Sequence, residues 1–146
     1  DKIQILQINF KNFGAVDKFC GEIVTVKCPE DNSLLRRLLG DDGTGKVLVV
    51  HGGASNACAY LGDNLALLAC QNNWAGILIN GMVRDVDELA KMQIGIKALG
   101  AHPKKSEKRG LGEFGHDIEF GGVKFQSGAF VYSDNNGVIV SSSQLL

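Results

Sequence analysis

The sequence predicts a mixed α/β domain in which a βαβα part is followed by antiparallel hairpins. Two apolar runs, at 46–50 and 76–80, each lead through a glycine-bearing loop into a helical pattern, as buried strands of a parallel sheet do. Near the carboxyl end, short strand-like runs are separated by Gly121-Gly122 and by residues 134–137 (DNNG), which are hairpin signals. These two halves together define the fold class.

Length and composition indicate an ordinary globular protein. The chain has 146 residues, with 45% hydrophobic and 21% charged, so one domain over 1–146 can bury a core without disulfides or metals. A net charge of −1 provides no global field for nucleic acid or an anionic membrane. No apolar run approaches the roughly 20 residues of a membrane span, and no signal-peptide pattern is visible, so we expect a cytoplasmic setting. The chain opens at Asp1 without methionine, which suggests a missing upstream segment.

The four cysteines, at 20, 28, 58 and 70, form no CxxC pair. Zinc ligation and a disulfide framework are therefore poorly supported, and buried free thiols are expected. His51, His102 and His116 are not at metal-ligand spacing. We expect them to be loop or strand-end residues rather than catalytic bases.

The first helix is expected directly after the first clear strand. Residues 1–21 support no assignment, whereas EIVTVKC at 22–28 alternates β-branched residues as a strand does. Pro29 ends this strand. Residues 31–33 (DNS) then offer helix-capping side chains before LLRRLL, and Gly40 is a usual helix stop.

Residues 40–47, GDDGTGKV, fit the G-x-x-x-x-G-K spacing of a phosphate-binding P-loop. That motif follows a strand, opens a helix and carries Ser or Thr after its lysine. Here the segment precedes the strand at 46–50, and Val47 stands where the hydroxyl belongs. We expect a turn, with nucleotide binding a remote alternative.

Each apolar strand should deliver a functional loop. After 46–50, a loop with at most one irregular turn covers 51–62, and a helix begins at Asp63 as its N-cap or first-turn residue. After 76–80, Gly81 allows the chain to turn sharply away from the strand, which exposes Arg84 and Asp85.

The remaining elements follow from the same signals. Asp85 or Asp87 caps a helix through Lys91, a strand covers 94–101, and the basic run 104–109 forms an exposed loop. The last strands are expected at 117–120, 123–125, 129–133 and 137–140.

The charged residues of the two glycine-bearing loops are Asp63, Arg84 and Asp85, with Glu88 one helical turn further on. The stretch between Asp63 and Arg84 fits one helix and its return strand, so the two side chains can face each other across a crevice. A helix start also presents unpaired amides that suit a carboxylate, here those of Gly62, Asp63, Asn64 and Leu65. Two plainer interpretations remain open: Asp63 merely caps its helix, and Arg84-Asp85 is a surface ion pair.

A small 2-oxo acid is one ligand to consider, because its carboxylate and keto oxygens can chelate one divalent cation. Such a cation needs only one or two protein carboxylates, and Asp85 is the better candidate. Arg84 offers a planar fork of donors for a developing enolate, and Asp63 could orient a metal-bound water that carries a proton. Neither loop contains a lysine, so a Schiff-base aldolase has no candidate there.

The pattern Gly62-Asp63, twenty residues, Arg84-Asp85, two residues, Glu88 resembles the signature of the RraA-like family. This family includes aldolases for 4-hydroxy-4-methyl-2-oxoglutarate and 4-carboxy-4-hydroxy-2-oxoadipate, and regulators of ribonuclease E activity. Flanking text resembles the family in colinear order over nearly the whole chain, at 26–39, 46–89, 94–110 and 120–140.

The resemblance implies a compact β/β/α swivelling domain that assembles as a trimer, or a dimer of trimers, with sites at subunit interfaces. It also implies that Gly62–Leu65 and Arg84 contact substrate and that Asp85 holds magnesium or manganese. The aldolase members cleave 4-hydroxy-4-methyl-2-oxoglutarate into two pyruvates and decarboxylate oxaloacetate through the same enolate. Some carry a carboxyl-terminal extension with a further metal-site carboxylate, whereas this sequence stops at Leu146, so the resemblance leaves catalytic efficiency and the physiological substrate open.

The resemblance leaves a second class of function open. Family regulators bind and inhibit ribonuclease E by protein contact, so an endoribonuclease or RNA helicase is an alternative partner. Regulators without an aspartate after the motif arginine lose the metal ligand, and the presence of Asp85 favours an enzyme. The basic run 104–109 lacks interleaved aromatics, which argues against direct nucleic-acid binding. No glycine-rich nucleotide motif supports a methyltransferase.

Overall fold

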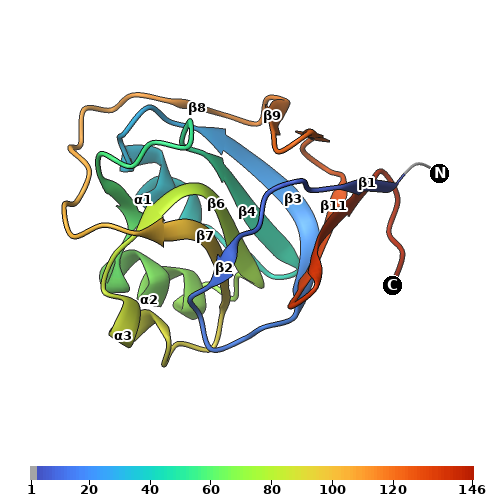
Figure 1. Ribbon diagram of the computed structural model, residues 1–146, viewed down its shortest axis with the longest axis horizontal. Coiled ribbons are helices and arrows are strands. Elements are labelled where there is room, and N and C mark those ends of the chain that lie inside the picture. Colours follow the sequence, from blue (N-terminus) through green and yellow to red (C-terminus); the bar gives the residue numbers. More distant parts are fainter. Residues whose placement is uncertain (1–2) are drawn as a thin grey trace.

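A curved sheet forms the body of the molecule, and its helices lie against one face (Figure 1). The computed structural model describes residues 3–146, so the prediction about Asp1 falls outside it. In spatial order the sheet consists of β1 (Ile3–Ile5), β12 (Gly137–Ser141), β11 (Phe130–Asp134), β3 (Phe19–Lys27), β4 (Lys46–His51), β6 (Gly76–Val83), β7 (Gly95–Ala101) and β2 (Lys11–Asn12). Beside this path lie β5 (Ala59–Leu61) on β6, β8 (Glu113–Phe114) on β3, and the separate pair β9 (Ile118–Phe120) and β10 (Val123–Phe125).

The centre of the sheet is parallel, as the apolar runs predict. Strands β3, β4, β6 and β7 pair in parallel, and the outer strands pair antiparallel. The side chains of β4 and β6 alternate between two cores, which is why both strands are apolar throughout. Helices α1 (Ser33–Leu39), α2 (Asp63–Gln71) and α3 (Val86–Leu89) cover one core, in which Leu35, Leu65 and Leu89 are almost completely buried.

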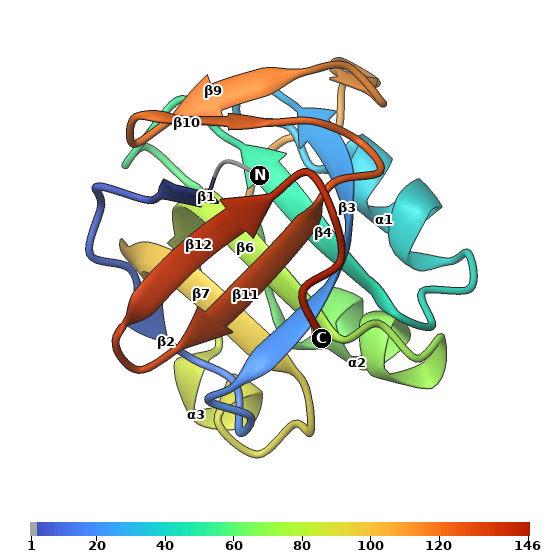
Figure 2. The same ribbon diagram turned by 90° about the vertical axis from the view of Figure 1, so that its right-hand side faces the viewer.

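The antiparallel strands cover the other face of the parallel sheet. Figure 2 shows the β11–β12 hairpin in front of the central strands, with β9 and β10 above it. Phe125 and Val131 pack there against Val49 and Leu78 from the parallel strands. The predicted mixed α/β class with terminal hairpins is therefore confirmed, and it has the β/β/α form.

Long-range polar contacts bring the ends of the sheet together. Lys97 Nζ on β7 donates a hydrogen bond to the main-chain carbonyl of Asp134, in the β11–β12 turn. Asn12 Nδ2 on β2 donates to Asn135 Oδ1 in the same turn, at 2.7 Å. The hairpin thereby reaches the opposite edge of the sheet, and the sheet takes a barrel-like curvature.

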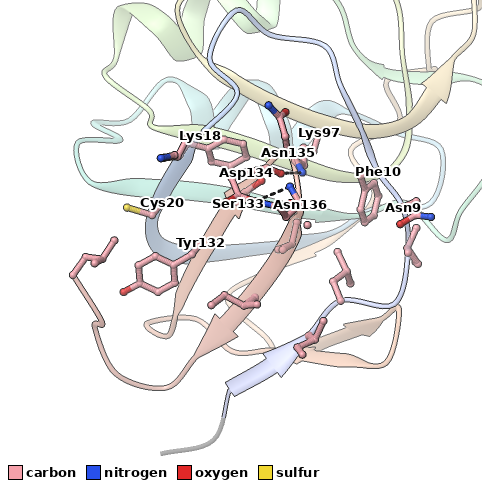
Figure 3. A pocket seen from close by; sticks show the side chains of 18 residues that line it. Asn9, Phe10, Lys18, Cys20, Lys97, Tyr132, Ser133, Asp134, Asn135 and Asn136 are labelled. Atoms are coloured by element: carbon pink, nitrogen blue, oxygen red, sulfur yellow. Dashed lines mark hydrogen bonds between the residues drawn. The ribbon is translucent and has the colours of Figure 1, made fainter.

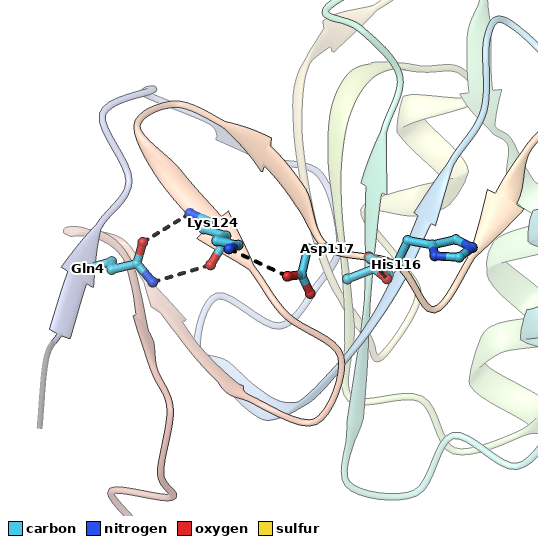
Figure 4. Close-up of polar contacts among 5 residues, drawn as sticks. Gln4, His116, Asp117 and Lys124 are labelled. Carbon is cyan, nitrogen blue, oxygen red and sulfur yellow. Dashed lines mark hydrogen bonds and ion pairs between the residues drawn. The ribbon is translucent and has the colours of Figure 1, made fainter.

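Beyond the hairpin, β1 is fastened to β10. The Lys124 main-chain amide donates to Gln4 Oε1 at 3.0 Å, and Gln4 Nε2 donates back to the Lys124 carbonyl at 3.2 Å (Figure 4). Lys124 Nζ forms an ion pair with Asp117 at 3.6 Å.

Several expected boundaries need correction. Residues 3–12, which supported no assignment, contain the two short strands β1 and β2. The predicted loop 51–62 contains β5, and the strand predicted at 76–80 continues through Gly81 to Val83. Gly81 therefore does not mark a departure from the sheet. The segment 40–47 is a turn leading into β4, as expected.

The cysteines are free, but they are not uniformly buried. Cys28 and Cys58 are buried, as predicted, whereas Cys70 is half-buried and Cys20 is exposed on β3, which corrects the expectation for these two. Within residues 3–146, no helix has the length and apolar character needed to cross a membrane.

Candidate functional site

The two glycine-bearing loops meet where β5 and β6 end. These strands are parallel neighbours, with Leu61 opposite Val83, and the Arg84 amide donates to the Leu61 carbonyl at 2.9 Å. The chain continues from β5 into Gly62-Asp63 and from β6 into Arg84-Asp85. Because parallel neighbours end at the same edge of a sheet, the structure brings the two predicted loops together.

A hydrogen bond to a carboxylate also joins the two loops at the start of α2. The Asp63 amide donates to Asp85 Oδ2 at 3.0 Å. Asp85 has φ 58° and ψ 43°, a left-handed conformation that an aspartate adopts more readily than most residues. This backbone turn directs its carboxylate toward the unpaired amides of α2, where a negative charge is favoured.

The same contact corrects the predicted capping roles. Asp85 occupies the N-cap position of α3, yet its side chain makes no capping hydrogen bond, because its carboxylate is bound to α2 instead. Gly62 is the N-cap of α2, and Asp63 is its first-turn residue, which was one of the two alternatives. Helix α3 ends at Leu89, earlier than the expected Lys91.

Gly62 is required by space rather than by an unusual backbone conformation. Its φ of −123° and ψ of −168° are ordinary extended values. A Cβ at this position would lie 2.7 Å from Asp85 Oδ2 and 3.1 Å from Arg84 Nε. Only glycine lets the α2 turn pack this closely on the Arg84-Asp85 pair.

The predicted amide cradle is only partly open. Asn64 is exposed, and Gly62 and Asp63 are half-buried. The Leu65 side chain is 4% exposed and packs in the core, so this residue can offer a ligand its main chain only. The cradle thus consists of main-chain groups at the start of α2 beside one carboxylate and one guanidinium.

Arg84 and Asp85 form a loose ion pair that remains open to solvent. Arg84 Nη1 lies 3.8 Å from Asp85 Oδ1, and the two side chains are 35% and 28% exposed. At this distance most guanidinium N–H donors stay available to a ligand. The arrangement can therefore present a cation and helix-start amides to the same small anion, with the Asp85 carboxylate beside them.

The donor set fits a weakly ligated hard cation rather than a protein-built metal cage. Among residues 3–146, no group of three or more His, Cys, Asp or Glu side chains is placed to share a metal. Asp85 supplies one carboxylate, and Asp63 lies beside it in the first turn of α2. Magnesium commonly binds through one or two carboxylates together with waters and substrate oxygens, so these residues fit it.

Tyr60 supports the strand that leads into the site, a role that has no direct signal in the sequence. Its ring is fully buried just before Leu61, and its hydroxyl accepts a hydrogen bond from the Glu30 amide at 2.7 Å. The hydroxyl lies 3.1 Å from two acceptors, the carbonyls of Cys28 and Gly52. Tyr60 thereby fixes β5 against the ends of β3 and β4.

The buried Tyr60 ring leaves an indirect trace in the sequence, because the positions that pack against it are glycines. A Cβ at Gly52 would lie 2.6 Å from the Tyr60 ring, and one at Gly81 would lie 2.8 Å from it. Gly81 therefore makes room for a buried ring, which is the physical reason that the predicted turn at this position is wrong.

The main chain of the basic run 104–109 is hydrogen-bonded to β5, the strand that leads into the site. The Ala59 amide donates to the Lys104 carbonyl at 2.7 Å, and the Ser106 amide donates to the Ala59 carbonyl at 3.1 Å. The side chains of the run are exposed as predicted, apart from the buried Ser106. The loop therefore extends the edge of β5 instead of being free.

A buried carboxylate, Asp31, anchors the far end of this loop. Its Oδ2 accepts hydrogen bonds from the amides of Arg109 and Leu111 at 2.7 and 3.0 Å, and its Oδ1 accepts from the amide and hydroxyl of Ser33. Burial alone would raise the pKa of Asp31, but these hydrogen bonds outweigh it and hold the pKa well below its usual range. Asp31 was predicted as part of a helix-capping segment, and its link to the loop was missed.

The histidines lie at strand ends or in a surface loop, as expected. His51 ends β4, where its Nδ1 accepts a hydrogen bond from the Gly53 amide, and His102 follows β7. His116 pairs with Glu113 at 3.8 Å on the surface. Two cavities, of about 660 and 670 Å³, lie elsewhere, and neither is lined by Gly62–Leu65 or Arg84-Asp85.

The fold is a β/β/α domain, and at its site a glycine turn packs on an Arg-Asp pair. These two features together define the class of protein. A family model described as RraA-like, Aldolase/RraA, matches residues 2–140. The chain therefore belongs to the RraA-like family.

Its sequence relatives include aldolases by name. An Acinetobacter baylyi protein, provisionally named a 4-hydroxy-4-methyl-2-oxoglutarate aldolase, is 55% identical over 137 residues, covering 94% of this chain and 81% of the relative. A Pseudomonas fluorescens protein with the same provisional name is 52% identical over 143 residues, covering 98% of this chain and 88% of the relative.

Solved structures with this fold carry different functional names. A Geobacillus kaustophilus protein described as an S-adenosylmethionine:2-dimethylmenaquinone methyltransferase matches with a TM-score of 0.96 and 43% identity, covering 98% of this chain and 89% of its own. The RNA-processing inhibitor RraA from Thermus thermophilus matches with a TM-score of 0.97 and 39% identity, covering 99% and 88%.

Proposed function

We propose that this protein is a divalent-metal-dependent carbon–carbon lyase that cleaves 4-hydroxy-4-methyl-2-oxoglutarate into two pyruvates. Decarboxylation of oxaloacetate would proceed at the same site, because both reactions leave the enolate of pyruvate. The observation that supports this most is the packing of the Gly62-Asp63 turn on Arg84-Asp85, with the Asp63 amide 3.0 Å from Asp85 Oδ2. The aldolase names of the relatives agree with it.

Arg84 stabilises negative charge on the substrate. Its guanidinium is held beside Asp85 but is bound loosely, at 3.8 Å, so its planar fork can donate to the carboxylate and to the developing enolate oxygen. A donor that meets charge as it forms lowers the barrier, and losing one typically costs about 3 kcal/mol.

The bond changes in the cleavage balance without any further reagent. The C4 hydroxyl loses its proton, the C3–C4 bond breaks, and C4 becomes the keto carbon of one pyruvate. The electron pair remains on the other fragment as an enolate, whose C3 then takes up a proton. Asp63, half-buried in the first turn of α2, is the group that we assign to carry this proton through a water molecule.

Asp85 is the residue that would hold a Mg²⁺ or Mn²⁺ ion, with the keto acid supplying further oxygens. When bound, such an ion supplies a Lewis acid for the enolate oxygen. The Asp63 amide keeps the Asp85 carboxylate oriented, because it binds one of its two oxygens and leaves the other facing Arg84.

A regulatory function is the second candidate, and the likeness to the Thermus RNA-processing inhibitor supports it. Such a protein would bind ribonuclease E or an RNA helicase through its surface and would not need Arg84 or Asp85. A methyltransferase function has less support here, because the glycines after β4 lead into β5 and not into a nucleotide-binding helix.

Pyruvate release from 4-hydroxy-4-methyl-2-oxoglutarate and from oxaloacetate tests the proposal. We expect turnover with Mg²⁺ or Mn²⁺, none with EDTA, and a loss of at least about 100-fold for Arg84→Ala and for Asp85→Ala. Asp87→Ala is the matched control, because Asp87 is an exposed aspartate two residues further along in α3. If the native chain shows no turnover but binds ribonuclease E tightly, the regulatory function replaces the lyase.

A further inference from the structure

A cavity of about 660 Å³ opens between the β11–β12 hairpin, the chain that joins β1 to β2, and the start of β3 (Figure 3). Its volume falls in the range of small-molecule sites, roughly 300–1,000 Å³. It shares no lining residue with the Arg84-Asp85 site. The fold therefore offers a second, separate place for a ligand.

The cavity contains a buried lysine that the proposed lyase chemistry does not use. Lys97, on β7, is 3% exposed, and its Nζ donates to the main-chain carbonyl of Asp134. Burial lowers the pKa of Lys97, and the carboxylates of Asp134 and Asp17 partly oppose this shift. An ammonium group has three N–H donors, so this one hydrogen bond leaves donors available at the cavity wall.

A buried hydroxyl lies in the same wall. Ser133 is 4% exposed, and its Oγ makes no hydrogen bond in the structure. Buried polar groups almost always have a partner, so this hydroxyl can take one supplied by a ligand or a water. A hydroxyl without a partner and an ammonium with spare donors together suit an oxygen anion.

Charges of both signs act on Lys97, because the carboxylates of Asp134 and Asp17 offset the two lysines of the lining. Lys97 and Lys18 contribute two cations to the lining, and Asp134 contributes one carboxylate. Asp134 is already partnered, because its Oδ1 accepts a hydrogen bond from the Asn136 amide at 2.8 Å, and this contact lowers its pKa. The rest of the wall is mostly apolar and includes Leu6, Ile8, Phe10, Phe19, Val138 and Ile139.

We infer that this cavity binds a small monocarboxylate with an apolar chain or ring. The carboxylate accepts hydrogen bonds from Lys97 Nζ and Ser133 Oγ, and the apolar part lies against Leu6 and Phe10. The site is independent of the proposed lyase function.

A purely structural role for Lys97 is the competing explanation. Lys97 and the Asn12–Asn135 hydrogen bond both tie the hairpin to the opposite edge of the sheet. That role accounts for the burial of Lys97, but it gives the Ser133 hydroxyl no partner. The two explanations differ in whether a carboxylate binds.

Titration of benzoate and hexanoate into the full native chain, followed by amide NMR, tests the inference. Saturable shifts should centre on Lys97 and Ser133, and the neutral benzamide should bind at least about tenfold more weakly than benzoate. Ser133→Ala should weaken benzoate binding about threefold or more with an unchanged melting temperature, and Lys97→Met should abolish binding.

Lys124→Met is the matched control. Lys124 lies on β10, outside the cavity, where its Nζ pairs with Asp117 (Figure 4). Its replacement should leave the Kd for benzoate unchanged. Absent or unsaturable shifts, equal binding of benzamide, or native affinity in Ser133→Ala would each overturn the inference. If Lys97→Met does not fold, the benzamide comparison and Ser133→Ala still decide it.

Discussion

Replacing Gly62 with alanine should disable the site while leaving the fold intact. The new Cβ would lie 2.7 Å from Asp85 Oδ2, whereas ordinary contact begins at 3.4 Å, so the carboxylate must move by about 0.7 Å. That movement breaks its 3.0 Å hydrogen bond from the Asp63 amide. Because a misplacement of about 1 Å can cost roughly 100-fold in rate, we expect kcat to fall about 30- to 100-fold.

The stability of Gly62→Ala should change little. The backbone angles of Gly62, −123° and −168°, are available to alanine, and a Gly-to-Ala change usually gains about 0.4–1 kcal/mol through the unfolded state. Steady-state pyruvate release and urea unfolding measure the two effects separately. Gly40→Ala is the control, since Gly40 ends α1 with a helical φ of −74° and no site contact. A Gly62→Ala variant with native kcat would refute the proposed role of this packing.

Buried groups give three further predictions. Asp31→Asn should cost about 1–3 kcal/mol in urea unfolding, because the amides of Arg109 and Leu111 lose the buried oxygen that accepts their hydrogen bonds. Asp42→Asn, with the same local turn but exposed, should cost under about 1 kcal/mol. The lowered pKa of Asp31 means that its contribution is present above its unfolded value of 3.8 and is lost as pH falls below that, so Asp31→Asn should flatten the acid limb of the stability profile. Tyr60→Phe should lower stability by about 1–3 kcal/mol in thermal unfolding, and an unchanged melting temperature would contradict its bracing role. Burial raises the pKa of Cys28 to about 12, so iodoacetamide at pH 8 should label the exposed Cys20 and spare Cys28; equal labelling rates would contradict this.

The central strands were predictable because local pattern and tertiary environment agree. Both faces of β4 and β6 are buried, so their runs are apolar without alternation. Strand β5 was missed because it has three residues and is held partly by the main chain of Lys104 and Ser106, far along the sequence. The short strands β1 and β2 likewise depend on partners more than 80 residues away, which no local window detects.

The meeting of the two site loops was also predictable, whereas its details were not. Parallel strand order alone places Gly62-Asp63 beside Arg84-Asp85. The left-handed backbone of Asp85, which turns its carboxylate away from its own helix, has no distinctive sequence signal. Gly81 misled the prediction because a glycine required for a turn and a glycine required for a buried ring look the same in a sequence.

Metal-dependent binding of oxalate, a planar analogue of the pyruvate enolate, tests the Arg84-Asp85 chemistry most directly. By calorimetry, the native chain should bind oxalate with Mn²⁺ present and lose that binding with EDTA. Asp85→Asn should bind it at least about tenfold more weakly, while Asp87→Asn should match the native chain. Equal oxalate affinity in native and Asp85→Asn proteins, or affinity that does not depend on the metal, would contradict the proposed site.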